Sequence, residues 1–226
     1  LPIFPSYQLL YYTPEKTYRY KVVVGKTSTP TPMLESILSH IETAPDWKIP
    51  NKIFINEMLP KAIKNNTYFE NNHIAVYDQK ESFVAINGKS LAQIKLNPTK
   101  YHARQTAGCD NALGTVVFRF NNPHSIYLHD TPEKQYFNRP KRALSHGCIR
   151  VESAEKLAAL LLEQDGQAGV IPSLKKAISS YSKKNFLIKN QVPIIITYLT
   201  ATIEEGLLVK HEDIYKLDKQ LKSSQK

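Results

Sequence analysis

Alternating apolar and polar positions predict β-strands through most of the chain. Aromatic and β-branched residues dominate 7–12 and 18–24, and the turn-forming stretch Thr13-Pro14-Glu15-Lys16 separates them, so the two segments predict a β-hairpin. Further strands are expected over 115–120, 124–129, 186–189 and 192–203, with 207–214 pairing back after a turn at Gly206. The fold class is therefore mainly β.

Helical spacing is confined to a few segments. Ser153 is expected to cap a helix that ends at Gly166 and buries Leu157, Leu160 and Leu161, and Ser173 a second helix that runs to about Tyr181. The segment 34–41 is ambiguous, because its apolar residues have helical spacing while the prolines before it favour extended chain. The helices should therefore lie at the periphery of a β fold.

The composition changes between about Trp47 and Arg104. Asn and Lys become frequent, and short helices are expected over 52–58 and 60–65, followed by a strand over 73–77. We interpret this stretch as a small, mostly helical inserted subdomain, with a long decorated loop as the alternative. The expected organisation is a first part of the main domain over 1–50, the insertion over 51–103, the core over 104–215 and a polar tail over 216–226.

Charge and length narrow the class of protein. The 226 residues are 42% hydrophobic, which is enough for one large core plus an insertion, and the net charge is +10. Such a surface attracts nucleic acid, an anionic membrane or a carboxylate-rich cell-wall polymer. The basic residues are scattered without a recognition pattern, so nucleic acid is the weakest of these partners. No apolar run is long enough to span a bilayer, and a start without Met or leader suggests a processed domain.

The stretch Ser145-His146-Gly147-Cys148-Ile149-Arg150 concentrates the candidate chemistry. A thiolate is the nucleophilic form of cysteine, and a nearby base or positive charge such as Arg150 favours it. The backbone N–H groups of Gly147 and Cys148 are candidate donors to an oxyanion. We expect an acyl-transfer site with Cys148 as the nucleophile. Cys109 is interpreted as a loop thiol.

Two histidines are candidates for the general base, and spacing alone does not choose between them. His146 would share a face with Cys148 in extended chain, whereas His129 ends a predicted strand and can approach the sulfur across the fold. The carboxylate or the carbonyl of Asp130 is a candidate for orienting the base. Zinc bound by Cys109, His129, His146 and Cys148 is the weaker alternative, since no CxxC or HxxxH pair anchors such a site.

His129, followed after fifteen residues by Ser145 to Arg150, is similar to the signature of the L,D-transpeptidase (YkuD-like) catalytic domain. The stretch from Gly108 to Gly114 and the Trp47-x-Ile49-Pro50 stretch also resemble this family, in its larger Gram-negative subtype with a capping subdomain. The resemblance implies a β-sandwich, a strand over 34–41 and no metal or cofactor. It also implies Cys148 as the nucleophile and His129 as the base, with Tyr127, Asp130, Ser145, His146 and Arg150 in supporting or substrate-binding roles.

The resemblance further implies a substrate and a location. Such enzymes attack the amide between meso-diaminopimelate and D-alanine of a peptidoglycan tetrapeptide, and they pass the thioester of the nucleophilic cysteine, here Cys148, to an acceptor amine. The acceptor is another stem peptide, giving a 3-3 cross-link, or an outer-membrane lipoprotein; carbapenems inhibit the family, and the expected location is the periplasm. A carboxypeptidase or another hydrolase that uses the same thioester and a non-catalytic cell-wall binding module are the alternatives.

Overall fold

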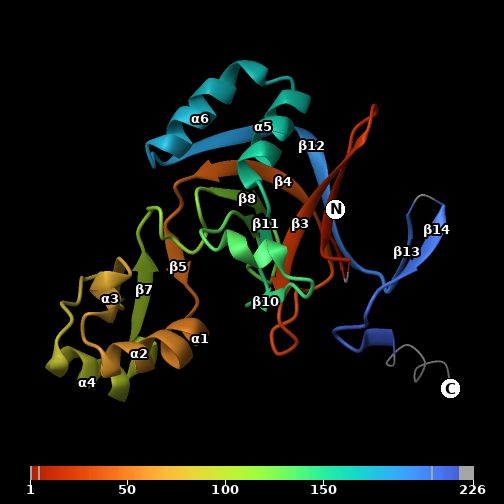
Figure 1. The fold of residues 1–226 in the computed structure, drawn as a ribbon. Helices are drawn as coiled ribbons and strands as arrows, with labels where there is room; N and C mark the ends of the chain where they lie inside the picture. The colour runs from red at the N-terminus through yellow and green to blue at the C-terminus, as the bar shows by residue number, and fades with distance from the viewer. Residues whose placement is uncertain (1, 5, 205, 219–226) are drawn as a thin grey trace.

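The computed structural model describes residues 2–4, 6–204 and 206–218, and it is organised around one large curled sheet (Figure 1). The strand order is β10-β3-β11-β9-β8-β4-β12-β1-β2, and β2 also pairs with β3, so the sheet closes on itself. Closure of this kind leaves few free strand edges and encloses a core. The expected mainly β fold with peripheral helices is confirmed. The strands of this sheet are β1 (Pro2–Phe4), β2 (Gln8–Tyr12), β3 (Thr17–Gly25), β4 (Leu34–Thr43), β8 (Val116–Phe120), β9 (Leu128–His129), β10 (Ala143–Ser145), β11 (Ile149–Val151) and β12 (Lys184–Tyr198).

The core fills the inside of this sheet and the space beneath two helices. Helices α5 (Ala154–Gln164) and α6 (Ile171–Ser179) lie together against the sheet beside β12 (Figure 1). Leu157 and Leu161 of α5 and Leu174 of α6 join one cluster with the strand residues Phe118 and Ile149. This packing holds the inner strands, on which the candidate site lies, in a rigid frame.

The segment 34–41, ambiguous from its spacing, is extended chain in β4. β12 pairs with it along one edge and β8 along the other, both antiparallel. Ladder hydrogen bonds on both sides satisfy the backbone, and this tertiary pairing outweighs the helical spacing of the apolar residues.

Several predicted bounds were wrong. The strand expected over 124–129 forms only at Leu128–His129. Ser125 has a φ of +53°, and the Asn122 side chain bonds to the backbone of Ile126, so the chain before Leu128 is a turn. Two strands were expected over 186–189 and 192–203, but a single strand, β12, runs from Lys184 to Tyr198. Its pairing with β4 shifts register between Leu187 and Val192, and the residues from Ala201 belong to the next strand.

The two predicted helix caps also differ from the structure. Ser173 lies inside α6, which begins at Ile171 with Pro172 in its first turn. Ser153 is the N-cap residue of α5, but its φ of +53° is left-handed and its side chain makes no capping hydrogen bond.

Residues 47–105, which we call the small lobe, surround a second cluster of buried residues that includes Ile49, Phe54, Phe69 and Ile94. The lobe lies apart from the curled sheet (Figure 1). The expected helices over 52–58 and 60–65 form one continuous helical segment with a π-helical turn in its middle, whereas α4 and β7 were missed. The limits at 51 and 103 stay a prediction, although β5 and the end of β7 lie just outside them. The elements of the lobe are β5 (Trp47–Ile49), α1 (Asn51–Ile53), η1 (Phe54–Met58), α2 (Leu59–Lys64), α3 (Tyr68–Asn71), β6 (Ile74–Asp78), α4 (Gly88–Leu96), η2 (Pro98–Lys100) and β7 (Tyr101–Gln105).

A separate hairpin follows the curled sheet. β13 (Ala201–Glu204) pairs with β14 (Leu207–Lys210), and most of the polar tail expected over 216–226 lies outside the described residues. The remaining short elements are η3 (Lys134–Asn138) and η4 (Ala168–Val170). No helix among the described residues is long and apolar enough to cross a membrane.

Candidate active site

A short parallel strand pair brings the two ends of the candidate motif together. In the β9–β11 ladder Leu128 pairs with Ile149 and His129 with Arg150, and the N–H of Ile149 donates to the Tyr127 carbonyl at 3.1 Å. Residues more than twenty positions apart in the chain thereby become neighbours.

The two faces of this strand pair differ, because one packs into the core and the other carries a residue of the candidate site. Leu128 and Ile149 belong to the buried core cluster. Successive side chains in a strand point to opposite faces, so His129 and its ladder partner Arg150 share the other face. Cys148 lies in the bend just before β11, where its thiol interacts with Tyr127, the residue just before β9.

His129 is fixed as a neutral base. Its Nδ1–H donates to the Asp130 carbonyl at 2.5 Å, its side chain is buried, and the edge of the ring contacts the Tyr127 ring at a centroid distance of 5.8 Å. Burial, and then the positive charge of Arg150, lowers the pKa of His129 to about 3. Nε2 is left as the proton acceptor at neutral pH. Of the two Asp130 groups considered, the carbonyl orients the ring.

The Asp130 carboxylate has a different function. It accepts hydrogen bonds from the N–H and hydroxyl of Thr115, both at 3.0 Å, and pairs with the ammonium of Lys134. Gly114 packs so closely against it that a Cβ there would lie 2.4 Å from Oδ2. The carboxylate therefore fixes the chain around His129.

His146 points toward the small lobe. Its Nε2 contacts Glu57 Oε1 at 2.6 Å and Lys26 Nζ at 3.4 Å, and Glu57 belongs to the π-helical turn η1. The bend at 146–148 also breaks the extended geometry that would place His146 beside the sulfur. His146 thus connects the motif to the small lobe.

Cys148 is a partly buried thiol. Its Sγ lies 3.9 Å from the carbonyl oxygen of Ser125. Burial raises the pKa of Cys148, and this effect outweighs the opposing effects of Tyr127, Arg119 and Arg150. Arg150 does favour the thiolate, as expected, but burial has the larger effect. Its guanidinium also pairs with the Glu133 carboxylate and covers the Tyr136 ring.

Hydrogen bonds hold the turn before Cys148 in one conformation. The N–H of Gly147 donates to Ser145 Oγ at 3.1 Å, and Ser145 Oγ donates to the Cys148 carbonyl at 2.6 Å. The φ of Gly147 is +121°, which favours glycine. On the other side, Thr31 Oγ1 donates to the Gly147 carbonyl at 2.7 Å.

This turn is supported from the far end of the chain. Thr31 Oγ1 accepts the N–H of Gly25 at 2.9 Å, and the Tyr215 hydroxyl donates to the Gly25 carbonyl at 2.5 Å. The loop that contains Thr29 and Thr31 passes so close to Gly25 that a Cβ on Gly25 would lie 2.2 Å from the Thr29 carbonyl oxygen. The position of the Gly147–Cys148 peptide therefore depends on Gly25 and Thr31.

A cleft of about 670 Å³ opens between the main domain and the small lobe and reaches Ser125 and Tyr127, the neighbours of the thiol. Charged side chains of both signs stand along it. Its lining comprises Glu42, Asp46, Lys48, Ile49, Pro50, Asn51, Arg104, Leu113, Arg119, Ser125, Tyr127 and Lys183.

Sequence reasoning missed Thr31, Glu57 and Arg119. None was predicted as a site residue, although Thr31 lies in a stretch that resembles the family, and each reaches the site through strand pairing or the approach of the small lobe. The apparent Thr-Pro loop before β4 was the one available signal for Thr31.

The zinc alternative requires several metal-ligating side chains close together. No group of three or more His, Cys, Asp or Glu side chains in the described part of the chain could hold a metal ion. Cys109 is free and exposed, and Cys148 is also free.

The fold and site define a mainly β protein with a histidine on one strand and a cysteine directly before the strand that pairs with it. The L,D-transpeptidase catalytic domain model, YkuD, matches residues 4–177, and the chain belongs to that family. It is also 35% identical over 222 residues, 96% of its length, to a Haemophilus influenzae protein named "Putative L,D-transpeptidase". The chain spans 44% of the length of that relative.

The raised pKa of Cys148 predicts slow alkylation at neutral pH. With Cys109→Ala, iodoacetamide should react with Cys148 slowly at pH 7, and the rate should rise about tenfold per pH unit and still increase above the ordinary thiol pKa of 9.0. Mass spectrometry of the adduct measures the rate. The Cys148→Ala variant, in which only the exposed Cys109 reacts, is the reference; a Cys148 rate that levels off below pH 7 would show a thiolate instead.

Proposed function

We propose that this protein is a peptidoglycan L,D-transpeptidase in which Cys148 is the nucleophile and His129 the base. The observation that carries the proposal is the β9–β11 pairing, which supports a site formed by His129 and by the bend that holds Cys148, next to a cleft. Family membership supports the reaction class. The substrates would be stem peptides of peptidoglycan, in the cell envelope.

The first half-reaction forms a thioester. His129 Nε2 accepts the proton of the Cys148 thiol while Sγ attacks the carbonyl carbon between diaminopimelate and D-alanine. The C–N bond then breaks, and His129 gives the proton to the leaving nitrogen, so D-alanine leaves with an uncharged amino group. The imidazole is neutral at rest, because the pKa of His129 is about 3, and it can accept a proton. The low pKa of His129 and the raised pKa of Cys148 both oppose proton transfer in the empty site, so the transfer would accompany the attack of Sγ on a bound carbonyl.

The second half-reaction restores the thiol. The amine of an acceptor, such as the diaminopimelate of another stem peptide or a lipoprotein, attacks the thioester carbonyl. His129 takes a proton from that amine, the C–S bond breaks, and the proton passes to the sulfur. The product is a new amide, and water in place of the amine would give hydrolysis.

The Cys148 N–H is the better candidate for the oxyanion donor. The N–H of Gly147, the other candidate, already donates to Ser145 Oγ. No described residue accepts the Cys148 N–H. Since carbonyl and N–H of one trans peptide point in opposite directions, the Thr31 bond to the Gly147 carbonyl aims the Cys148 N–H away from Thr31.

The small lobe would cover the donor peptide. Lys48, Ile49 and Arg104 of the lobe line the cleft. The contact between Glu57 and His146 joins the lobe to the motif. Carbapenems, which also present a reactive carbonyl, would acylate the same sulfur.

Removing the Thr31 hydroxyl should slow acylation. Thr31→Val keeps the shape but leaves the Gly147 carbonyl and the Gly25 N–H without their partner, so we expect a loss of about tenfold or more in the acylation rate and about 1–3 kcal/mol of stability. Thr31→Ser restores the hydroxyl and should recover most of the rate. Stopped-flow acylation by a carbapenem measures it; an unchanged rate in a less stable Thr31→Val protein would make the role only structural.

Replacing the nucleophile should abolish turnover. We expect Cys148→Ala to form no carbapenem adduct by mass and no product from disaccharide tetrapeptides, while Cys109→Ala behaves as wild type, because Cys109 is exposed in a loop. Chromatography of the muropeptides separates the activities: cross-linked dimers support a transpeptidase and tripeptides a carboxypeptidase. Binding without product in the wild type, or an adduct on Cys109, would contradict the proposal.

Replacing the base should slow the reaction without unfolding the protein. His129→Ala is expected to lower the acylation rate by about 10²–10⁴-fold. His146→Ala is the matched control and should retain far more activity, because its ring faces Glu57. Thermal unfolding checks the fold of both variants. A fast His129→Ala together with a slow His146→Ala would transfer the base role to His146.

A further inference from the structure

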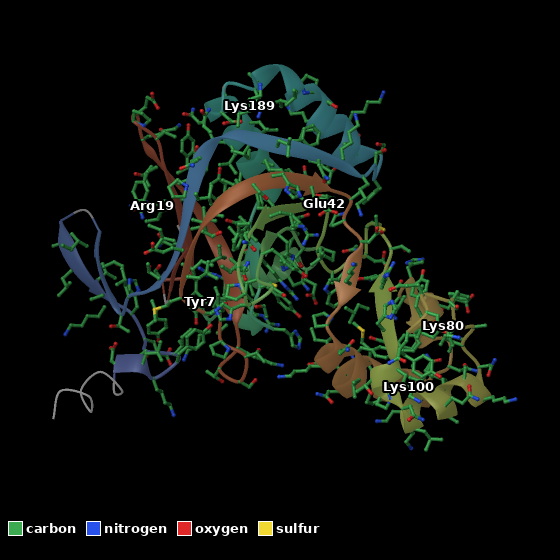
Figure 2. All side chains as sticks on the ribbon, turned by 180° about the vertical axis from the view of Figure 1, so that it is seen from behind. Tyr7, Arg19, Glu42, Lys80, Lys100 and Lys189 are labelled. Carbon is green, nitrogen blue, oxygen red and sulfur yellow. The ribbon has the colours of Figure 1, made fainter. Side chains whose placement is uncertain are left out.

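A row of alternating charges crosses the cleft from the nucleophile. Arg119 Nε donates to Glu42 Oε2 at 2.8 Å, Lys183 Nζ lies 3.5 Å from Glu42 Oε1, and Lys183 Nζ also lies 3.0 Å from Asp46 Oδ2. All four side chains line the cleft. Figure 2 labels Glu42 on the part of β4 that leads toward the small lobe.

Strand register fixes where the row begins. In the antiparallel β8–β9 ladder Val117 pairs with His129, so Arg119 stands opposite Tyr127 on the face that carries the imidazole. The Arg119 guanidinium covers the Tyr127 ring at 4.9 Å. Strand β9 lies between β8 and β11, and neighbouring strands are about 5 Å apart, so the backbone at Arg119 is about 10 Å from the β11 side that holds Cys148. A substrate side chain of a few methylenes together with the extended Arg119 side chain spans this distance.

The charges in the row cancel. Arg119 and Lys183 oppose Glu42 and Asp46, so neither a simple anion nor a simple cation would be matched in full. A ligand with a carboxylate and an ammonium on one carbon matches both signs, the carboxylate on the guanidinium and the ammonium on the carboxylates. The Glu42 carboxylate is largely buried, its side chain 10% exposed, which strengthens its interactions.

We propose that Arg119, Glu42, Asp46 and Lys183 form a subsite for a zwitterionic α-amino acid group, the free end of the diaminopimelate side chain. The inference rests on the proposed function and names the group of the substrate that selects it. A stem peptide with lysine at the same position has the ammonium without the carboxylate, and it would leave Arg119 and Lys183 unmatched.

Chemical modification of the substrate tests both halves of the subsite. We compare kcat/KM for three tetrapeptides: unmodified, with the diaminopimelate side-chain carboxylate amidated, and with the side-chain amine acetylated. Wild type should prefer the unmodified peptide by about tenfold or more over each. Lys183→Gln and Arg119→Gln should reduce the preference over the amidated peptide, and Asp46→Asn and Glu42→Gln the preference over the acetylated peptide.

Lys183 and Asp46 are half exposed, so their variants should fold even if the Glu42 or Arg119 variants do not. Arg19→Gln, on the distant β2–β3 hairpin, is the matched control and should keep both preferences. Equal kcat/KM for the three peptides, or preferences that none of the four substitutions changes, would overturn the subsite.

A binding measurement separates this inference from the proposed function. Calorimetry with Cys148→Ala uses free meso-diaminopimelate, with pimelate and 1,5-diaminopentane as ligands of one charge sign. Binding of meso-diaminopimelate alone, lost in Lys183→Gln, supports the subsite even if no turnover is found. Normal carbapenem acylation in wild type without selective meso-diaminopimelate binding leaves the proposed function standing and overturns the subsite.

Discussion

The parallel pairing of β9 with β11 is the constraint on which the site depends. Two hydrogen-bonded strands of only a few residues bury Leu128 and Ile149 on one face and present His129 on the other, and Tyr127 and Cys148 stand directly before the two strands. A shift of one residue would turn the imidazole into the core and the isoleucine into the cleft. The curled sheet, closed through β2 and β3, and the helices packed on it hold this register.

Burial sets the electrostatics of the site. It lowers the pKa of His129 and raises the pKa of Cys148, so the resting pair is an imidazole and a thiol rather than an imidazolium and a thiolate. A thiol of this kind is protected from adventitious alkylation and oxidation, because the thiolate is the reactive form. In the proposed reaction, proton transfer would accompany attack on a bound carbonyl, and a substrate that displaces water from the cleft would help to activate the thiol.

The sequence was sufficient for the mainly β class, for the first hairpin and for the SHGC motif, because these depend on local alternation and on residue type. Spacing could not choose between His129 and His146, since the orientation of His146 toward Glu57 depends on where the small lobe lies. The path of β12 and the contacts of Thr31 and Arg119 depend on pairing between distant strands. Helix α4 was missed although Asn87 and Ser90 form a capping box, because the flanking Asn and Lys residues gave no apolar stripe.

The small lobe and the charged row of Arg119, Glu42, Lys183 and Asp46 would together select the donor peptide. Cys148 and His129 lie on the main domain, whereas Lys48 and Arg104 of the lobe supply one wall of the cleft. Glu57 of the lobe also contacts His146, two residues from the thiol. A donor that fills the row from Arg119 to Lys183 would be held against Tyr127 with its scissile amide near the sulfur. The energy of recognising the charged end would thus be used to position the amide for attack, as orientation of reactants requires.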